Sequence, residues 1–495
     1  MSFWFIDHIF HRLSSGETWI LGILIFWAVY NLIEYTGSNK QKLNLPPKAA
    51  YSLPLFGHTL YVVFNSSWFL DWCTKTYGEV FDLDLIGTTV TVAAGRCAED
   101  VLKADPSDLS IVEGAITDIL HLDYVIDRKM YDIGFEGNPS IARKTISNAK
   151  IAEYTERITC SIHRGIEDLL IDTDAIVLKD PNHFLRELVA YVGVSFVIGH
   201  EVETNAEVIA SFRKFTDDLM DNIPIFLIMP RFFHRLISSF LQAPSHHCQV
   251  MRHHVLPVIR FRRQQMAEAA ARGVPHGLEP NFMQGQIEYT KPDGTQYNDE
   301  EIIQGVLFMA FASVHTTSLH MGFALYWLLA RPDLRQELEK EIEEVLGAGP
   351  ITDKGLKKMV LLNNFVHESL RHGVDKLANG KKALKDYTFT NGYQIPKGRT
   401  VEVASRQLNM GSNVNPSTPK AMDLQFTSKR QPTTPSRNFV TFGMGKHVCP
   451  GRFVAVLEIK LFIITLLQYY DVSTLDKKIP QPKEEMTRVS HHFHN

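Results

Sequence analysis

The longest run of apolar residues in the chain lies between Asn298 and Arg331. Asn298 followed three residues later by Glu301 is the pattern of a capping box, which begins a helix, and Pro332 ends the run. Roughly 32 residues at 1.5 Å each make a helix of about 48 Å, which can cross a whole domain. Its apolar residues lie on all sides, which favours burial inside a large protein. A membrane span is the alternative, but the run contains too many polar residues: Gln304, Ser313, His315, Thr316, Thr317 and His320.

The rest of the chain is mostly helical in pattern, with a few segments that favour strands. Residues 80–95 alternate apolar and polar side chains around Gly87-Thr88, which is typical of a hairpin. Residues 383–405 carry the turn signals Asn391-Gly392 and Lys397-Gly398. Further helices are predicted at about 332–346, 354–372 and 450–470, and a polar loop at about 273–298. The pattern predicts a mainly α fold with a small β region (α+β).

A second apolar segment, residues 19–35, carries aromatic residues within it and at its ends, as interfacial anchors do. It is shorter than the about 20 residues that span a bilayer, so local thinning or flanking residues would complete the span. A buried core helix or a cleaved signal is the alternative, but no small-residue cleavage site follows. Three lysines follow the segment while only Arg12 precedes it closely, which predicts a cytoplasmic main body. We therefore expect a lumenal N-terminus (1–18), a transmembrane anchor (19–35), a proline-rich linker (36–58) and a catalytic domain (59–495).

Charge and cysteine content exclude two classes of protein. The formal net charge of -4 and the sequence pI near 6.6 show no basic excess, so a nucleic-acid-binding surface is not expected. The five cysteines are scattered, with no CxxC pair and no zinc-finger spacing. A disulfide framework is therefore not expected, which fits a reducing compartment.

One of these cysteines lies in an unusual setting, the stretch FGMGKHVCPG at residues 442–451. A thiolate is a soft ligand for iron, and a glycine-rich turn lets backbone N–H groups approach the sulfur. The predicted helix that follows directs its N-terminal dipole at Cys449 and favours the anion. A buried structural cysteine is the alternative and the more usual case for a cysteine taken at random.

The spacing Phe442-x-x-Gly445-x-x-x-Cys449-x-Gly451 resembles the haem-binding loop of the cytochrome P450 family, the haem-thiolate monooxygenases. Two further motifs resemble that family in the same order: the segment from Ala312 to Thr317 in the long helix, and Glu368-x-x-Arg371. The apolar N-terminal segment and the proline-rich linker resemble its microsomal members. The resemblance implies the cytochrome P450 fold behind an N-terminal transmembrane anchor.

The resemblance also implies a cofactor site. Heme b would be held by Cys449 as the axial ligand of its iron, with Phe442 and Gly443 beside the sulfur. The haem propionates would meet His447, Lys381 and Arg143, where Lys381 stands in place of the family's usual arginine. Glu368 and Arg371 would form a buried pair that supports the cysteine loop. The arginine that usually joins this pair is replaced by Gln425.

The long helix would supply the catalytic groups. Thr316 would help to deliver protons during dioxygen activation, and the alternative is a hydroxyl bonded to its own helix. His315 occupies the place where many members carry an acid. Fungal members often show His-Thr-Thr here, so the chain resembles a fungal member, and His315 would relay protons or merely pack. Phe308, Phe311 and Ala312 are candidate substrate contacts, with core packing as the alternative.

The implied function is hydroxylation of an apolar small molecule, terpenoid or steroid-like, with O2 and electrons from NADPH-cytochrome P450 reductase. The implied location is the endoplasmic reticulum membrane, where the chain would contact membrane lipid as a single-pass protein. Two alternatives stay open. One is a haem-thiolate isomerase or dehydratase that needs no reductase, and the other is a non-catalytic membrane haem-binding protein.

Overall fold

The computed structural model describes residues 43–54, 56–85, 88–170, 176–229, 231–240, 243–347, 349–411, 422, 424 and 430–479. The predicted lumenal segment and transmembrane anchor lie outside these residues, as do the first part of the linker, the Gly87 turn and Gln425.

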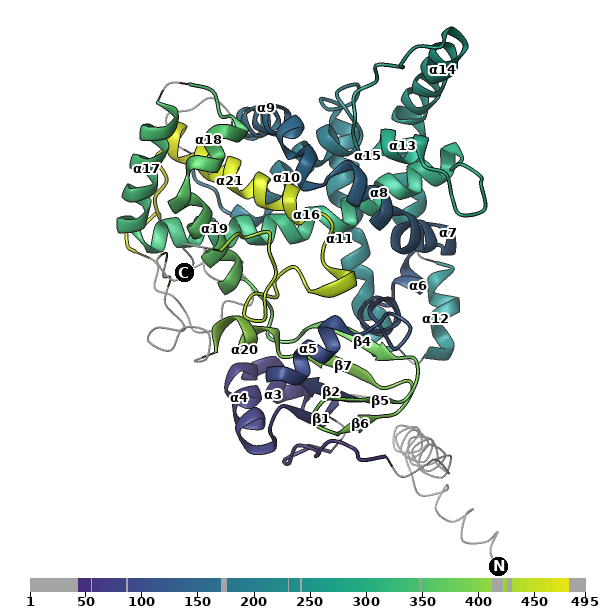
Figure 1. Ribbon diagram of the computed structural model, residues 1–495, viewed down its shortest axis with the longest axis vertical. Helices are drawn as coiled ribbons and strands as arrows, with labels where there is room; N and C mark the ends of the chain where they lie inside the picture. The colour runs from purple at the N-terminus through teal and green to yellow at the C-terminus, as the bar shows by residue number, and fades with distance from the viewer. Residues whose placement is uncertain are drawn as a thin grey trace, which may run out of the picture.

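A long central helix, α16 (Asp299–Ala330), organises the helical body and runs through its middle in Figure 1. It packs against α10 (Pro181–Val197), α11 (Ala206–Ile228), α19 (Val360–His372) and α21 (Arg452–Tyr469). Because neighbours surround it, apolar side chains on nearly every side of α16 are buried. This confirms the predicted buried helix, including its capping box between Asn298 and Glu301.

In the described part of the chain, α16 is also the one helix long and apolar enough to cross a membrane. Two thirds of its most apolar window is buried inside the protein. It is therefore the core helix of the body, as the polar side chains within it indicated.

A five-stranded sheet lies at one end of the molecule, with the order β1-β2-β7-β4-β3. β1 (Val80–Leu85) and β2 (Thr88–Ala93) form the predicted antiparallel hairpin. β7 (Thr400–Val403) pairs parallel to β2 and antiparallel to β4 (Ala378–Ala383). The sheet therefore joins the first part of the chain to the segment that follows α19.

The remaining elements surround these two parts. Near the sheet lie β3 (Leu109–Ser110), β5 (Tyr387–Thr388), β6 (Gln394–Ile395), α3 (Thr59–Phe64), α4 (Ser66–Tyr77), α5 (Gly95–Lys103) and α20 (Ser405–Met410). The others are η1 (Val112–Ile119), α6 (Leu122–Val125), α7 (Arg128–Asp132), η2 (Ile133–Gly137), α8 (Asn138–Thr145), η3 (Asn148–Lys150), α9 (Ile151–Leu169), α12 (Arg231–Ser238), α13 (Ala243–His254), α14 (Leu256–Arg272), α15 (Phe282–Glu288), α17 (Pro332–Leu346), α18 (Asp353–Lys358) and η4 (Gly445–His447).

Two expectations about secondary structure were wrong. The predicted loop at about 273–298 contains α15, which begins because the Asn281 side chain accepts a hydrogen bond from the Gln284 N–H. The single helix predicted over 354–372 is two helices, α18 and α19, separated at Met359. The carboxylate of Glu341 accepts the N–H groups of Leu361 and Leu362 and so caps the second helix.

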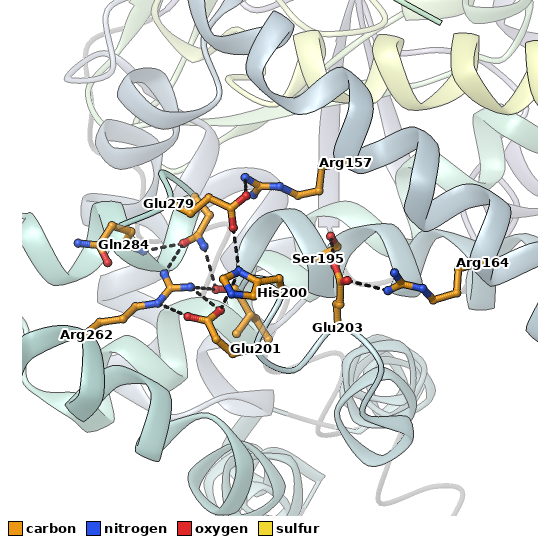
Figure 2. Close-up of polar contacts among 11 residues, drawn as sticks. Arg157, Arg164, Ser195, His200, Glu201, Glu203, Arg262, Glu279 and Gln284 are labelled. Carbon is orange, nitrogen blue, oxygen red and sulfur yellow. Dashed lines mark hydrogen bonds and ion pairs between the residues drawn. The ribbon is translucent and has the colours of Figure 1, made fainter. Parts of the chain in front are cut away.

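A buried arginine ties α14 to the chain between α10 and α11, as Figure 2 shows. Arg262 is 1% exposed and donates to both carboxylate oxygens of Glu201, at 2.8 and 2.7 Å. It also donates to the Asn281 side chain at 3.1 Å and to the Ile198 carbonyl at 3.2 Å. Burial alone would raise the pKa of Glu201, but the hydrogen bonds and charge of Arg262 lower it. All of the charge is compensated within the chain, so this network is structural.

Candidate functional site

The Cys449 loop precedes α21 and turns back on itself before the helix begins. Gly443 and Gly445 have φ angles of +69° and +70°, a region that only glycine adopts without strain. A Cβ on Gly445 would lie 3.1 Å from the Leu102 carbonyl oxygen, and one on Gly443 would lie 3.2 Å from the Asn379 side chain. Both glycines are therefore geometric requirements of the loop.

The sulfur of Cys449 lies where backbone donors meet. The Cys449 N–H donates to the Phe442 carbonyl at 2.9 Å, which closes the loop. Burial raises the pKa of the Cys449 thiol, whereas N–H groups of Gly451 and Arg452 and the Arg452 charge act to lower it. The residue nevertheless keeps some accessible surface.

The predicted pair of Glu368 and Arg371 lies inside α19 with no exposed side-chain surface. The guanidinium donates to both carboxylate oxygens at 2.8 Å. Burial would raise the pKa of Glu368, but hydrogen bonds from His367 and Arg371 lower it to about 2. The pair is therefore ionised and fully desolvated, so losing one member would leave an uncompensated buried charge.

A chain of hydrogen bonds connects this pair to the cysteine loop through Asn409 in α20. Arg371 donates to the Asn409 carbonyl at 3.1 Å, and the Asn409 side chain donates to the Arg371 carbonyl at 3.3 Å. The same side chain accepts the Val440 N–H at 2.9 Å and donates to the Thr441 hydroxyl at 3.1 Å. Thr441 directly precedes Phe442, so α19 positions the start of the loop through Asn409.

Three cationic or basic groups gather beside the loop, and the carboxylate whose charge acts on His447, that of Asp105, is itself paired with Lys446. Lys381 is 1% exposed, and among the described residues its Nζ has one hydrogen bond, to the Leu102 carbonyl at 3.4 Å. Burial lowers the pKa of Lys381 to about 8. Burial also lowers the pKa of His447, with further lowering from the charges of Lys381 and Arg143. His447 Nε2 is buried and makes no hydrogen bond to any described residue.

This set of donors fits the haem that the loop implies. A buried ammonium with one long hydrogen bond, next to an unsatisfied imidazole nitrogen and an arginine, suits two anionic carboxylates. Haem b carries two propionates, and its iron takes a thiolate on one axis. The residues present therefore provide for both the iron and the anionic edge of the group.

One face of α16 breaks the burial of the central helix. Ala312 and Thr316, one turn apart, are exposed, although most of the helix is buried. The Thr316 hydroxyl donates to the Ala312 carbonyl at 3.0 Å. It is therefore bonded to its own helix, which was the alternative to a catalytic role in the sequence analysis. One turn further, His320 has a buried Nδ1 with no hydrogen-bond partner in the described structure, and burial lowers its pKa to about 4. The face thus combines a small side chain, a hydroxyl and an unsatisfied imidazole.

The other predicted residues of α16 lie in different surroundings. His315 Nε2 lies 2.9 Å from Asp217 Oδ1 of α11. Phe308 is 6% exposed and packs edge-to-face against Phe135 of η2, with ring centroids 4.9 Å apart. Phe311 is half-buried, 5.7 Å from the Phe308 ring. Of the three predicted substrate contacts, Ala312 shares the exposed face with Thr316, and Phe308 is placed as a core side chain.

Sequence reasoning missed Asn409, His320 and Asp217. The spacing of His320, four residues after Thr316, would have placed it on the same helical face. Asn409 and Asp217 have no such signal, because their partners lie 38 and 98 residues away in the chain.

Comparison with known proteins agrees with this geometry. The family model for cytochrome P450 matches residues 46–492. The chain is similar to cytochrome P450 monooxygenase 151 of Postia placenta, with 24% identity over 81% of this chain and 82% of that protein. It is also similar to cytochrome P450 monooxygenase paxP of Penicillium paxilli, with 25% identity over 96% of this chain and 92% of that protein.

A solved structure shares the fold. Retinoic acid-bound cyanobacterial CYP120A1 superposes with a TM-score of 0.66 and 19% identity, covering 87% of this chain and 93% of that one. The expected mostly helical fold with a small sheet region is thereby confirmed. The chain belongs to the cytochrome P450 family, the monooxygenases that hold haem b through a cysteine thiolate.

Proposed function

We propose that this protein is a membrane-anchored monooxygenase that hydroxylates an apolar small molecule of the terpenoid or steroid class. Residues 59–495 would form its catalytic domain, and the Cys449 thiolate would hold the iron of its haem. The observation that carries the proposal is the Cys449 loop, where a desolvated sulfur meets backbone N–H donors beside uncompensated Lys381 and His447.

The haem-side residues take separate roles. Phe442 and Gly443 shape the loop around the sulfur, and the N–H groups of Gly451 and Arg452 stabilise its anionic form. Lys381, His447 and Arg143 bind the propionates. Glu368 and Arg371 hold the start of the loop through Asn409.

Haem, when bound, supplies the activation of dioxygen, and the chain supplies binding, orientation and protons. The exposed face of Ala312 and Thr316 lines the side where substrate binds, and Phe311 adds apolar surface there. The Thr316 hydroxyl is bonded to its own helix at rest, so it exchanges that bond for one to water or substrate when it transfers a proton. His315, which directly precedes Thr316 in the helix and lies 2.9 Å from Asp217 Oδ1, is the second proposed catalytic residue.

Electrons and location follow from the family. We infer an NADPH-dependent flavoprotein reductase that binds near Lys446, Arg452 and Lys460, on the side of the Cys449 loop. Residues 19–35 anchor the chain in the endoplasmic reticulum membrane with the catalytic domain in the cytoplasm.

A carbon monoxide difference spectrum of the reduced protein tests the iron ligand. We expect the band of a thiolate-bound haem in the wild type and its loss in Cys449→Ser. Cys160 is exposed and serves as the matched control, so Cys160→Ser should keep the band. A wild type without the band, or an unchanged band in Cys449→Ser, would refute the proposal.

Substrate class and electron source need a second experiment. Difference spectra with a panel of steroids, terpenoids and fatty acids should show a spin-state shift for at least one of the first two classes. That compound should then be hydroxylated only with NADPH and reductase. Turnover that persists without both would identify an isomerase or dehydratase instead.

A further inference from the structure

Two buried hydrogen-bond acceptors lie on α6 and α12 without a donor among the described residues. His234 of α12 is 1% exposed, and its Nε2 lies 2.8 Å from the Met229 carbonyl. Because a carbonyl only accepts, Nε2 carries the hydrogen, and in the neutral ring the lone pair lies on Nδ1. This Nδ1 is buried and makes no hydrogen bond to any residue that the structure describes. Oδ1 of Asp123 in α6 is a second buried acceptor in the same situation.

Aromatic rings surround these acceptors where α6, α11 and α12 meet. The His234 ring packs edge-on against Tyr124 and His121, at centroid distances of 5.0 and 5.3 Å. It packs in the same way against Phe226 of α11, at 5.2 Å. Burial raises the pKa of Asp123, and the charge of His234 acts in the opposite direction. The two side chains are therefore close enough to interact electrostatically, and they belong to one site.

This site adjoins the exposed face of α16. Phe308 lies one turn before Ala312 on that helix and packs against Phe135, whose ring centroid lies 4.9 Å from that of Tyr131. The Tyr131 hydroxyl is 2.7 Å from that of Thr117 in η1. η1 is followed closely by α6, and Figure 1 shows α6 and α12 between the helical body and the sheet. Contacts therefore run from the exposed face of α16 to the segment that carries one of the two acceptors.

The surroundings of Asp123 favour a positive charge. The charges of Asp118 and Glu113 add to the effect of burial and raise its pKa further. Asp118 is itself paired with Lys382, whereas Asp123 forms no ion pair with any described residue. A desolvated carboxylate without a cation is costly. The site therefore calls for a cation, just as the basic groups beside the cysteine loop call for an anion.

We propose that His234 Nδ1 and Asp123 Oδ1 bind a protonated amine of the substrate. The inference rests on the proposed function and narrows its substrate class to apolar skeletons that carry a basic nitrogen. Two acceptors need two donors from one ligand atom, which an ammonium supplies and a hydroxyl does not. The ammonium also balances the Asp123 carboxylate, and aromatic rings attract it through cation–π contacts. A bound water has two donors as well, but it leaves the negative charge unbalanced.

Alkylimidazoles test the proposal on the haem-loaded full chain, because the imidazole binds the iron and the alkyl chain extends away from it. Probes of graded chain length end in a methyl, a hydroxyl, a primary ammonium or a carboxylate group. The shift of the Soret band gives their dissociation constants. At the chain length that reaches the site, we expect the ammonium probe to bind about tenfold tighter than the methyl probe. The carboxylate probe should bind more weakly than the methyl probe at that length.

Variants assign this preference to the two acceptors. Asp123→Leu and His234→Phe should each abolish most of the advantage of the ammonium probe. The matched control is a second carboxylate–imidazole pair, in which Asp218 Oδ2 lies 3.0 Å from His247 Nε2 and the Ser211 hydroxyl lies 2.8 Å from His247 Nδ1. Both nitrogens of that ring have partners within the chain. Asp218→Leu should therefore keep the full preference.

A second measurement separates a binding role from a structural one. Because Asp123 has no cationic partner to lose, Asp123→Leu should not lower the free energy of unfolding of the ligand-free protein. A clear loss of stability would mark Asp123 as structural and overturn the inference. Asp123→Asn, which keeps the shape of the side chain, serves if Asp123→Leu does not load haem, and it should reduce the preference to a similar extent.

Equal binding of the methyl and ammonium probes at every chain length would overturn the inference and leave water as the donor. A hydroxyl probe that binds as tightly as the ammonium probe would overturn it too, because charge would then play no part. An unchanged preference in both variants would place the amine elsewhere. A wild type whose Soret band no probe shifts would instead defeat the proposed haem site, so the two failures are distinguishable.

Discussion

Arg262 and Lys381 are both 1% exposed, yet the chain treats their charges in opposite ways. Arg262 has a bidentate carboxylate, an amide oxygen and a carbonyl around it. Figure 2 shows that side chains converge on it from several segments. Lys381 has one long hydrogen bond in the described structure, and its charge acts on His447 together with that of Arg143. The Asp105 carboxylate, which also acts on His447, is paired with Lys446. A buried charge balanced by the chain supports the fold, whereas one left unbalanced indicates a missing anion.

The largest effect on stability should come from breaking the hydrogen-bond network of Arg262. Glu201→Gln removes the negative partner of Arg262 and should lower the free energy of unfolding by about 3 kcal/mol. Haem content per folded molecule should stay normal. Chemical unfolding and the carbon monoxide spectrum measure the two quantities. Glu207→Gln is the control, because Glu207 is exposed and solvent screens its pair with His254, so this variant should leave the free energy of unfolding nearly unchanged.

Lys381→Met should weaken haem binding without lowering the stability of the apoprotein, the reverse of the result expected for Glu201→Gln. The apoprotein should keep its stability, because the variant removes an uncompensated buried charge and retains the apolar stem. Haem should dissociate about tenfold faster, since a charged hydrogen bond of about 1.5 kcal/mol or more is lost. Transfer of haem to apomyoglobin measures the rate. Lys382→Met, which removes a lysine paired with Asp118, should leave that rate unchanged, and equal rates for both variants would contradict the assignment.

The pH dependence of the two sites should have the same sign but fall in different pH ranges, because both folded-state pKa values are lowered and the unfolded chain binds more protons in each case. The folded-state pKa of Lys381 is lowered from 10.5 to about 8, so the unfolded chain binds more protons between these values. Stability of the haem-free protein should therefore rise as pH increases from about 8 toward 10.5, and this rise should vanish in Lys381→Met. The pKa of Glu201 is lowered from 4.5, so its contribution is complete above pH 4.5 and is lost as pH falls below it.

His447 should give the smallest change. Its Nε2 provides one hydrogen bond, worth about 1 kcal/mol, so His447→Phe should speed haem loss about fivefold at most. The neighbouring Lys446 is exposed and paired with Asp105, so Lys446→Met should not change haem retention. Equal effects of the two variants would remove His447 from the propionate site.

The features that the sequence predicts well are those formed by residues close together in the chain. The capping box of α16, the positive-φ glycines of the cysteine loop and the i,i+3 pair of Glu368 and Arg371 are all written within ten residues. The roles of Asn409 and Asp217 depend on tertiary packing between distant segments, which no spacing reveals. The break at Met359 was missed because the Glu341 carboxylate that caps α19 comes from α17.

The cysteine loop also has a consequence for protein design. Its backbone is held by groups that the loop itself does not contain: the Asn409 side chain binds Val440, just before the loop, and Leu102 and Asn379 confine Gly445 and Gly443. A ten-residue graft of FGMGKHVCPG onto another helical scaffold would transfer the cysteine but not the residues that hold the loop in its conformation. The transferable unit is the loop together with α19, α20 and the end of α5, so the motif is portable only with its framework.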